Sequence, residues 1–125
     1  MATRMYSRAG CAITVVVFGL FVWFVVKHAI LVWRMAHAET LTAHIEELRE
    51  KAIQASPAEA AQELEIIIGF YPSGTVQVEG SPLDRMVERV RRSAIREIIA
   101  HLRAVTKEDL GDDPWPWVAR YRKDH

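Results

Sequence analysis

Residues 9–26 of this chain, AGCAITVVVFGLFVWFVV, are eighteen residues without a charged side chain. At a rise of about 1.5 Å per residue, an α-helix of this length covers about 27 Å, close to the hydrocarbon thickness of a bilayer, about 30 Å. A lone β-strand would leave its backbone unpaired in lipid, so the many valines do not argue for a strand. The stretch therefore predicts a single transmembrane helix, which we place at residues 9–33, after an N-terminal tail at residues 1–8.

Polar and aromatic residues mark the far end of this predicted span. Lys27 and His28 interrupt the apolar sequence, and tryptophans stand on both sides of them. Tryptophan is enriched where a span meets the headgroups, and lysine can lay its stem along the helix with the ammonium among the headgroups. We therefore interpret five residues as the membrane interface: Trp23, Lys27, His28, Trp33 and Arg34.

The same polar residues allow a different hypothesis. Ionisable side chains inside a span often line a path for ions or protons, which would make the chain a redox or ion-translocating accessory subunit that uses Lys27, His28 and His37. A single helix offers no second ligand and no wall for such a path. His37 and His44 share a helix face, but a zinc site needs about three or four ligands and this face offers no full set. The sequence therefore predicts no metal and no cofactor.

The N-terminal segment also bears on processing and orientation. Residues 36–38, AHA, resemble a signal-peptidase site, yet the apolar run is long for a signal peptide and Lys27 precedes the site. An uncleaved membrane span is therefore the favoured interpretation. Arg4, Arg8 and the amino terminus precede the span, whereas Lys27 and Arg34 follow it. The positive-inside rule then leans towards a cytoplasmic N-terminus, and the side of the C-terminal domain stays undecided.

An amphipathic segment, residues 34–55, follows the predicted span. Its apolar residues recur at spacings of three and four, as in the a/d seam of a short coiled coil: Ala38, Leu41, Ile45, Leu48 and Ala52. No helix breaker separates it from the span, so one helix is predicted from about Ala9 to about Ala55. About two heptads are too few to be stable alone. The seam is therefore either the stalk of a dimer or a face that the rest of the chain covers.

Three helix-start signals divide the remaining residues, 56–125. SPAE at residues 56–59 and SPLD at residues 81–84 each combine a serine N-cap, a proline at the first helical position and an acid two residues later. They predict helices reaching about Phe70 and about Val105. The turn YPSG at residues 71–74 ends the first helix, and TVQV at residues 75–78 is an extended connector. Asp113 and Pro114 start a short terminal helix. We thus expect an all-α chain: a transmembrane helix, an amphipathic stalk and a small antiparallel helical domain.

The predicted helical domain resembles a known family. VRRSAIREI at residues 90–98 is similar to the second helix of a HEAT repeat, in which V-R-x-x-A-I-x-x-L recurs. Residues 102–117 resemble the closing segment of some bacterial HEAT-repeat proteins, L-x-x-x-T-G-x-D-x-G-x-D-P-x-x-W, at Thr106, Asp109, Gly111, Asp113, Pro114 and Trp117. Lys107 stands where glycine is usual, and Pro116 also departs from the pattern, so we expect a differently shaped turn. The resemblance, over residues 57–121, implies an antiparallel helix pair that packs against something, and no catalysis.

The composition and the absence of known motifs argue against several classes of function. The net charge is zero, with 16 basic and 16 acidic residues, and residues 39–70 carry seven acids against two bases. No region has the sustained basic excess of a nucleic-acid binder. The single cysteine, Cys11, excludes an internal disulfide. Because the sequence holds no phosphate-binding glycine loop and no recognisable nucleophile arrangement, it predicts neither an enzyme nor a small-molecule substrate.

The function that these features favour is a single-pass, membrane-anchored helical module for protein–protein contact. Such a protein would serve as an anchor, adaptor or accessory subunit, and its partners would be the bilayer and either another protein or a second copy. The candidate contact residues are Leu41, Ile45 and Leu48 in the seam, and Trp115, Trp117 and Tyr121 in the terminal helix. For the terminal aromatics, closure of the domain core is favoured over a return to the membrane interface, since large aromatic side chains usually bury most of their area.

Overall fold

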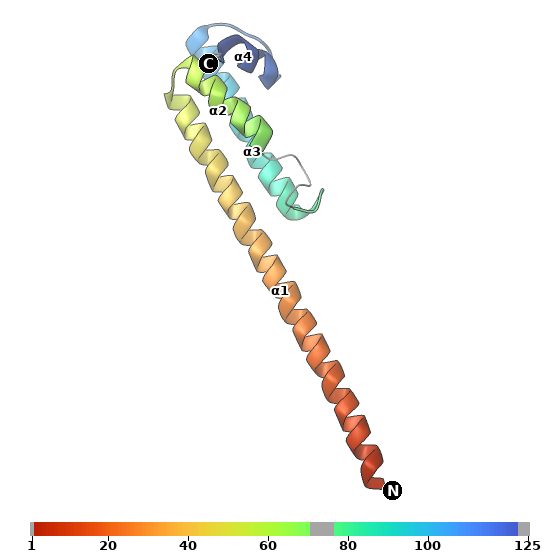
Figure 1. Ribbon diagram of the computed structural model, residues 1–125. Coiled ribbons are helices and arrows are strands. Elements are labelled where there is room, and N and C mark those ends of the chain that lie inside the picture. The colour runs from red at the N-terminus through yellow and green to blue at the C-terminus, as the bar shows by residue number, and fades with distance from the viewer. Residues whose placement is uncertain (1, 71–76, 123–125) are drawn as a thin grey trace. The chain divides into compact units, whose positions relative to one another are not determined.

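The computed structural model describes residues 2–70 and 77–122, with side chains described from residue 10 onward. It contains four helices within these ranges, α1 (Ala2–Gln54), α2 (Pro57–Phe70), α3 (Pro82–Thr106) and α4 (Pro114–Tyr121), as Figure 1 shows. The described residues include no β-strand, so the predicted all-α class is confirmed. The predicted turn at residues 71–74 and the first half of the connector, residues 75–76, lie outside the described residues. The chain divides into two compact units, Met1–Ala36 and His37–His125.

Helix α1 begins earlier than the sequence indicated. It starts at Ala2 rather than near Ala9, so residues 2–8, which we expected to form a tail, are helical. Its segment Gly10–Gln54 is long and apolar enough to cross a membrane. The most apolar window of 18 residues has a mean hydropathy of 2.4, and none of it is buried. In the first unit the large apolar side chains from Ile13 to Met35 are all exposed.

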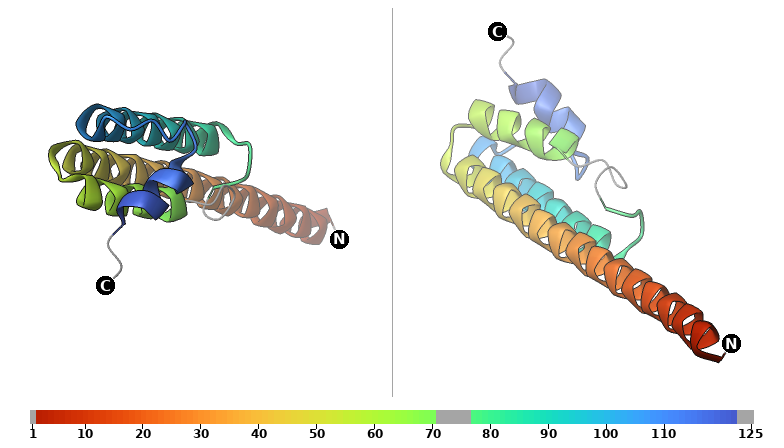
Figure 2. Two further views of the ribbon diagram at one scale, coloured as in Figure 1. Left: turned by 90° about the horizontal axis from the view of Figure 1, so that it is seen from above. Right: turned by 60° about the horizontal axis from the view of Figure 1, so that its bottom comes forward.

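The second unit is a small helical domain with one core. Helix α2 packs against both α3 and α4, and Figure 2 shows α4 crossing α2. Residues 37–54 of α1 belong to the same unit and contribute to the same core. The core combines Ala38, Ile45 and Ala52 from α1, Leu64 and Ile67 from α2, Val87, Ala94, Ile98 and Leu102 from α3, and Trp117 and Val118 from α4. Two apolar side chains of α3, Met86 and Val105, lie outside this core and are exposed.

The predicted helix starts are confirmed by their hydrogen bonds. The backbone N–H and the hydroxyl of Ser56 both donate to Glu59 Oε2, at 3.1 and 2.8 Å, before α2. At α3 the hydroxyl oxygen of Ser81 accepts from the Asp84 backbone N–H at 3.1 Å. At α4 the carboxylate of Asp113 accepts from the second helical N–H at 3.1 Å. The Ser81 and Asp113 side chains each satisfy an N–H group that the first turn of a helix leaves without a partner, whereas Ser56 is itself the donor to Glu59.

Candidate functional site

The first group of candidate residues lies on the apolar part of α1. The Lys27 ammonium nitrogen lies over the Trp23 ring, 4.6 Å from its centroid. Side chains on a helix lean towards its N-terminus, so a residue naturally covers the one four positions earlier. The contact has the geometry of a cation–π interaction. Lys27 thus has an aromatic partner on its own helix, which the sequence analysis did not anticipate.

His28 is similarly engaged with its own helix. Its Nδ1 atom lies 3.3 Å from the backbone carbonyl oxygen of Phe24, and the two ring centroids are 4.2 Å apart. Trp33 is exposed and Arg34 is half-buried. In the part of the chain that the structure describes, no three His, Cys, Asp or Glu side chains are placed together as metal ligands.

The seam residues of α1 are not a free surface. Ile45 is fully buried and Leu41 and Leu48 are each 8 % exposed, all within the core that α1, α2 and α3 share. This decides between the two alternatives for the seam: the chain covers it itself. The expectation that Leu41, Ile45 and Leu48 contact another protein is therefore corrected. The physical reason is that a lone helix pair cannot bury its apolar faces, and residues 38–52 of α1 supply the third layer.

The terminal aromatic residues differ in their exposure. Trp117 is fully buried, and its indole N–H donates to the Gly111 carbonyl oxygen at 2.8 Å. Its ring stacks on the ring of Tyr121, whose hydroxyl donates to Glu108 Oε2 at 2.5 Å. Trp115, in contrast, is 54 % exposed. Trp117 is thus a core residue rather than a contact residue, and Tyr121 is half-buried. Of these three candidates, Trp115 is the exposed one.

A charged cluster fixes the turn between α3 and α4. Arg103 Nε donates to Asp109 Oδ1 at 3.0 Å, and its Nη2 lies 3.3 Å from Asp112 Oδ1. Asp109 Oδ1 also accepts the Gly111 backbone N–H at 3.0 Å. The Gly111 N–H first, and then the Arg103 guanidinium, lower the pKa of Asp109 below its ordinary value. These contacts make the acidic residues parts of a turn rather than ligands.

The same turn contains a strained backbone position. Lys107 has φ 61°, in the left-handed region, and its N–H donates to the Arg103 carbonyl oxygen at 3.1 Å as the C-cap of α3. This is the conformation for which glycine is the usual residue. We expected a lysine here to change the shape of the turn. The finding is that the lysine adopts the left-handed backbone conformation itself.

Glu63 is a buried acidic residue that the sequence pattern did not identify. Glu63 on α2 is 5 % exposed, and its Oε1 bonds to the Lys51 ammonium on α1. Its Oε2 has no hydrogen-bond partner among the described residues. The available signal was spacing, because Glu63 lies three residues after Ala60 and four before Ile67, on the buried face of α2. The hydrogen bond that the Lys51 ammonium donates to Glu63 raises the pKa of Lys51 above its ordinary value.

The arginine-rich face of α3 lines an open groove of about 900 Å³. Four arginines contribute to it, at positions 85, 89, 92 and 96, together with the acids Glu79, Asp84, Glu88 and Asp112. Burial raises the pKa of Glu88, but hydrogen bonds from Arg91 and Arg92 outweigh it and leave that pKa lowered. No unpartnered buried polar atom of the described residues lines the groove. The face is therefore a mixed, partly ion-paired surface.

Comparisons of the chain with models of protein families, with curated proteins and with solved structures found no match. The functional interpretation thus depends on the geometry of the molecule. Three features carry it: an apolar helix with an uncovered surface, a helical domain whose core is closed by its own chain, and an exposed tryptophan at the start of α4.

Proposed function

We propose that this chain is a single-pass membrane anchor that holds a small helical domain at the bilayer for contact with a protein partner. The observation that carries the proposal is the uncovered apolar surface of α1, none of which is buried over its most apolar 18 residues. Leaving large apolar side chains in water forgoes about 1.5–3 kcal/mol for each of them. A bilayer accepts such a helix, because every backbone polar group is bonded within it.

The distribution of charge supports this placement. Trp23 and Lys27 form a contact of the kind found where a span meets the headgroups, and no acid occurs before Glu39. The proposed orientation has the N-terminus in the cytoplasm, since Arg4, Arg8 and the amino terminus flank one end of the span and only Lys27 and Arg34 stand at the other end. Reporter fusions at the two ends of the chain test this orientation.

In this proposal α2 and α3 form a HEAT-like helix pair, and part of α1 covers the apolar face of the pair. Contact between α2 and α3 and the burial of Trp117 support this part of the proposal. Repeats of this kind usually need neighbours to bury their faces. Here residues 38–52 of α1 take the neighbour's place, so the domain needs no partner to complete its core. A partner would then meet exposed residues rather than the seam.

Trp115 is the residue that we assign to partner contact. It lies in the first turn of α4, is 54 % exposed and is not part of the core cluster. Tryptophan is enriched among the residues that dominate protein–protein binding energies, because it combines a large apolar area with few rotatable bonds. We propose no catalytic role for any residue of the chain.

Crosslinking of the full chain in its own cell, followed by affinity capture and mass spectrometry, tests the proposal. The comparison is between the unchanged chain, Trp115→Ser and Ile66→Ser, a matched loss of an exposed apolar side chain on α2. We expect a protein partner with the unchanged chain and with Ile66→Ser, and much less of it with Trp115→Ser. Equal capture by all three would contradict the role of Trp115. Failure of every form to capture a protein would contradict the proposed function.

A further inference from the structure

A patch of mixed chemistry surrounds the first turns of α3. It consists of Val78, Arg85, Met86 and Arg89, all of them exposed. Val78 and Met86 are apolar and are 57 % and 42 % exposed. The Ser81 N–H donates to the Val78 carbonyl oxygen at 2.9 Å, which fixes Val78 beside the start of the helix. We call these four residues the α3-start patch.

Both arginines of the patch are exposed. Arg85 Nη1 donates to the Gly80 carbonyl oxygen at 2.7 Å, which leaves its other guanidinium N–H groups available. Among the described residues, the Arg89 side chain forms no ion pair and no hydrogen bond. Two acids of α3 stand beside these arginines in the sequence. Asp84 is 4 % exposed and its Oδ2 accepts the Gly80 N–H at 2.9 Å, and the half-buried Glu88 is ion-paired with Arg91 and Arg92. Glu79 is the exposed acid of the same stretch.

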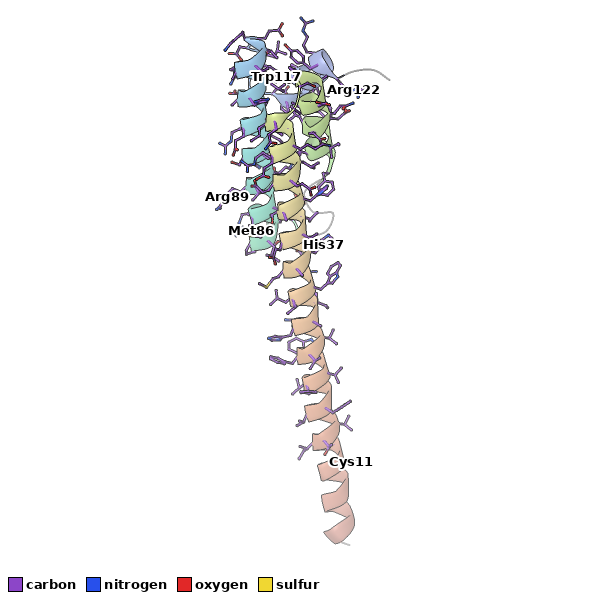
Figure 3. All side chains as sticks on the ribbon, turned by 90° about the vertical axis from the view of Figure 1, so that its left-hand side faces the viewer. Cys11, His37, Met86, Arg89, Trp117 and Arg122 are labelled. Carbon is purple, nitrogen blue, oxygen red and sulfur yellow. The ribbon has the colours of Figure 1, made fainter. Side chains whose placement is uncertain are left out.

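The patch occupies one particular end of the helical domain. Figure 3 shows Met86 and Arg89 at the end where His37, the first residue of the domain, lies, and Trp117 and Arg122 at the other end. His37 follows Trp33 by four residues. Even a fully extended chain covers only about 14 Å over four residues. If residues 9–33 span a bilayer, the end that carries His37 therefore stays within reach of the headgroups, a layer of about 5–7 Å on each side.

We propose that the α3-start patch rests on the bilayer surface. Met86 and Val78 would enter the boundary between headgroups and acyl chains, while Arg85 and Arg89 would bind lipid phosphates. An apolar side chain beside a cation suits this layer, because the two groups find an apolar phase and phosphate oxygens within a few ångströms of each other. The inference rests on the proposed membrane anchoring and adds a second contact to it, which restricts how the domain is oriented on the membrane.

Fluorescence quenching on the full chain in phosphatidylcholine vesicles tests the patch. In a Cys11→Ala background, Val78→Cys or Val105→Cys carries an environment-sensitive fluorophore, and a small fraction of the lipid carries a nitroxide on its headgroup. Val105 is the matched control, since it is 51 % exposed and lies about 35 Å further along α3, 23 residues beyond Pro82. We expect quenching at position 78 to exceed quenching at position 105 several-fold. Equal quenching at both positions would overturn the inference.

A charge-reversal pair tests the role of the arginines. With the label at position 78, the variant Arg85→Glu/Arg89→Glu should lose most of the quenching, whereas Arg96→Glu, another exposed arginine of α3, should keep it. Unchanged quenching in the double variant would overturn phosphate binding by this patch. Flotation of the same vesicles separates the two proposals. A chain that does not float with lipid contradicts the membrane anchor, whereas a chain that floats but is not quenched at position 78 contradicts only the patch.

Discussion

The indole N–H of Trp117 donates a hydrogen bond to the Gly111 carbonyl oxygen at 2.8 Å while the ring is fully buried. This bond joins α4 to the turn that follows α3, and it satisfies the one polar atom of a large side chain in the core. Gly111 has φ 85°, a conformation that other residues rarely adopt. The Gly111–Trp117 hydrogen bond thus holds α4 in place where it packs against α2.

Replacing Trp117 should therefore damage the domain far more than replacing Trp115. We expect Trp117→Ala to lower the free energy of unfolding by about 3–5 kcal/mol, since it removes a fully buried aromatic side chain. Trp115→Ala should cost about 0.5 kcal/mol or less, because most of its ring faces solvent. Denaturant titration of the detergent-solubilised full chain, followed by circular dichroism, measures both. Losses of similar size would contradict the assignment of Trp117 as the closing residue.

Relief of the strain at Lys107 should stabilise the protein. A lysine in the left-handed region carries a conformational cost that glycine does not, so Lys107→Gly should raise the free energy of unfolding by about 0.5–1 kcal/mol. Ala104→Gly, within α3 and exposed, is the control and should lower it by about 1 kcal/mol. The same titration reports both changes. A destabilised Lys107→Gly would show that the lysine side chain does more than tolerate this backbone conformation.

The domain should lose stability in acid. Hydrogen bonds from Tyr121 first and then Arg120 lower the pKa of Glu108, and the Gly111 N–H and Arg103 lower that of Asp109. A lowered folded-state pKa means that the unfolded chain binds protons first as pH falls. The stabilisation is therefore fully present above the ordinary carboxyl values, about 4, and is lost as pH falls through the lower folded values. We expect the denaturant concentration at the unfolding midpoint to decrease as the pH falls below about 4, and to decrease less in Glu108→Gln/Asp109→Asn. A midpoint that does not change with pH would contradict these contacts.

The Lys51–Glu63 contact predicts that removing the lysine alone destabilises the protein more than removing both charges. Lys51→Ala leaves the buried carboxylate of Glu63 without its cation, so the denaturation midpoint should fall. Adding Glu63→Leu to that variant removes the buried charge and should restore much of the loss. Lys51→Arg keeps the cation and should stay close to the unchanged protein. A double variant less stable than Lys51→Ala would contradict the interpretation.

Sequence reasoning succeeded where the determinants are local. The helix-start bonds at Ser56, Ser81 and Asp113 join residues three positions apart or fewer, so α2, α3 and α4 start where the sequence predicted. The a/d seam of α1 was ambiguous, because the same spacing serves a dimer and a helix covered by its own chain. Trp115 and Trp117 are two residues apart and so lie on different faces of α4; spacing alone does not decide which one faces the core. Long-range contacts decided these cases.

The central claim is that α1 anchors the chain in a membrane, and an alkaline carbonate wash of membranes from cells that make the protein tests it most directly. The wash strips peripheral proteins and leaves those whose helices cross the bilayer. We predict that the chain stays in the membrane pellet and is not cleaved after residue 38, because the apolar run is long enough to span and Lys27 precedes the AHA sequence. Release of the chain into the supernatant, either intact or shortened by cleavage after residue 38, would contradict the account.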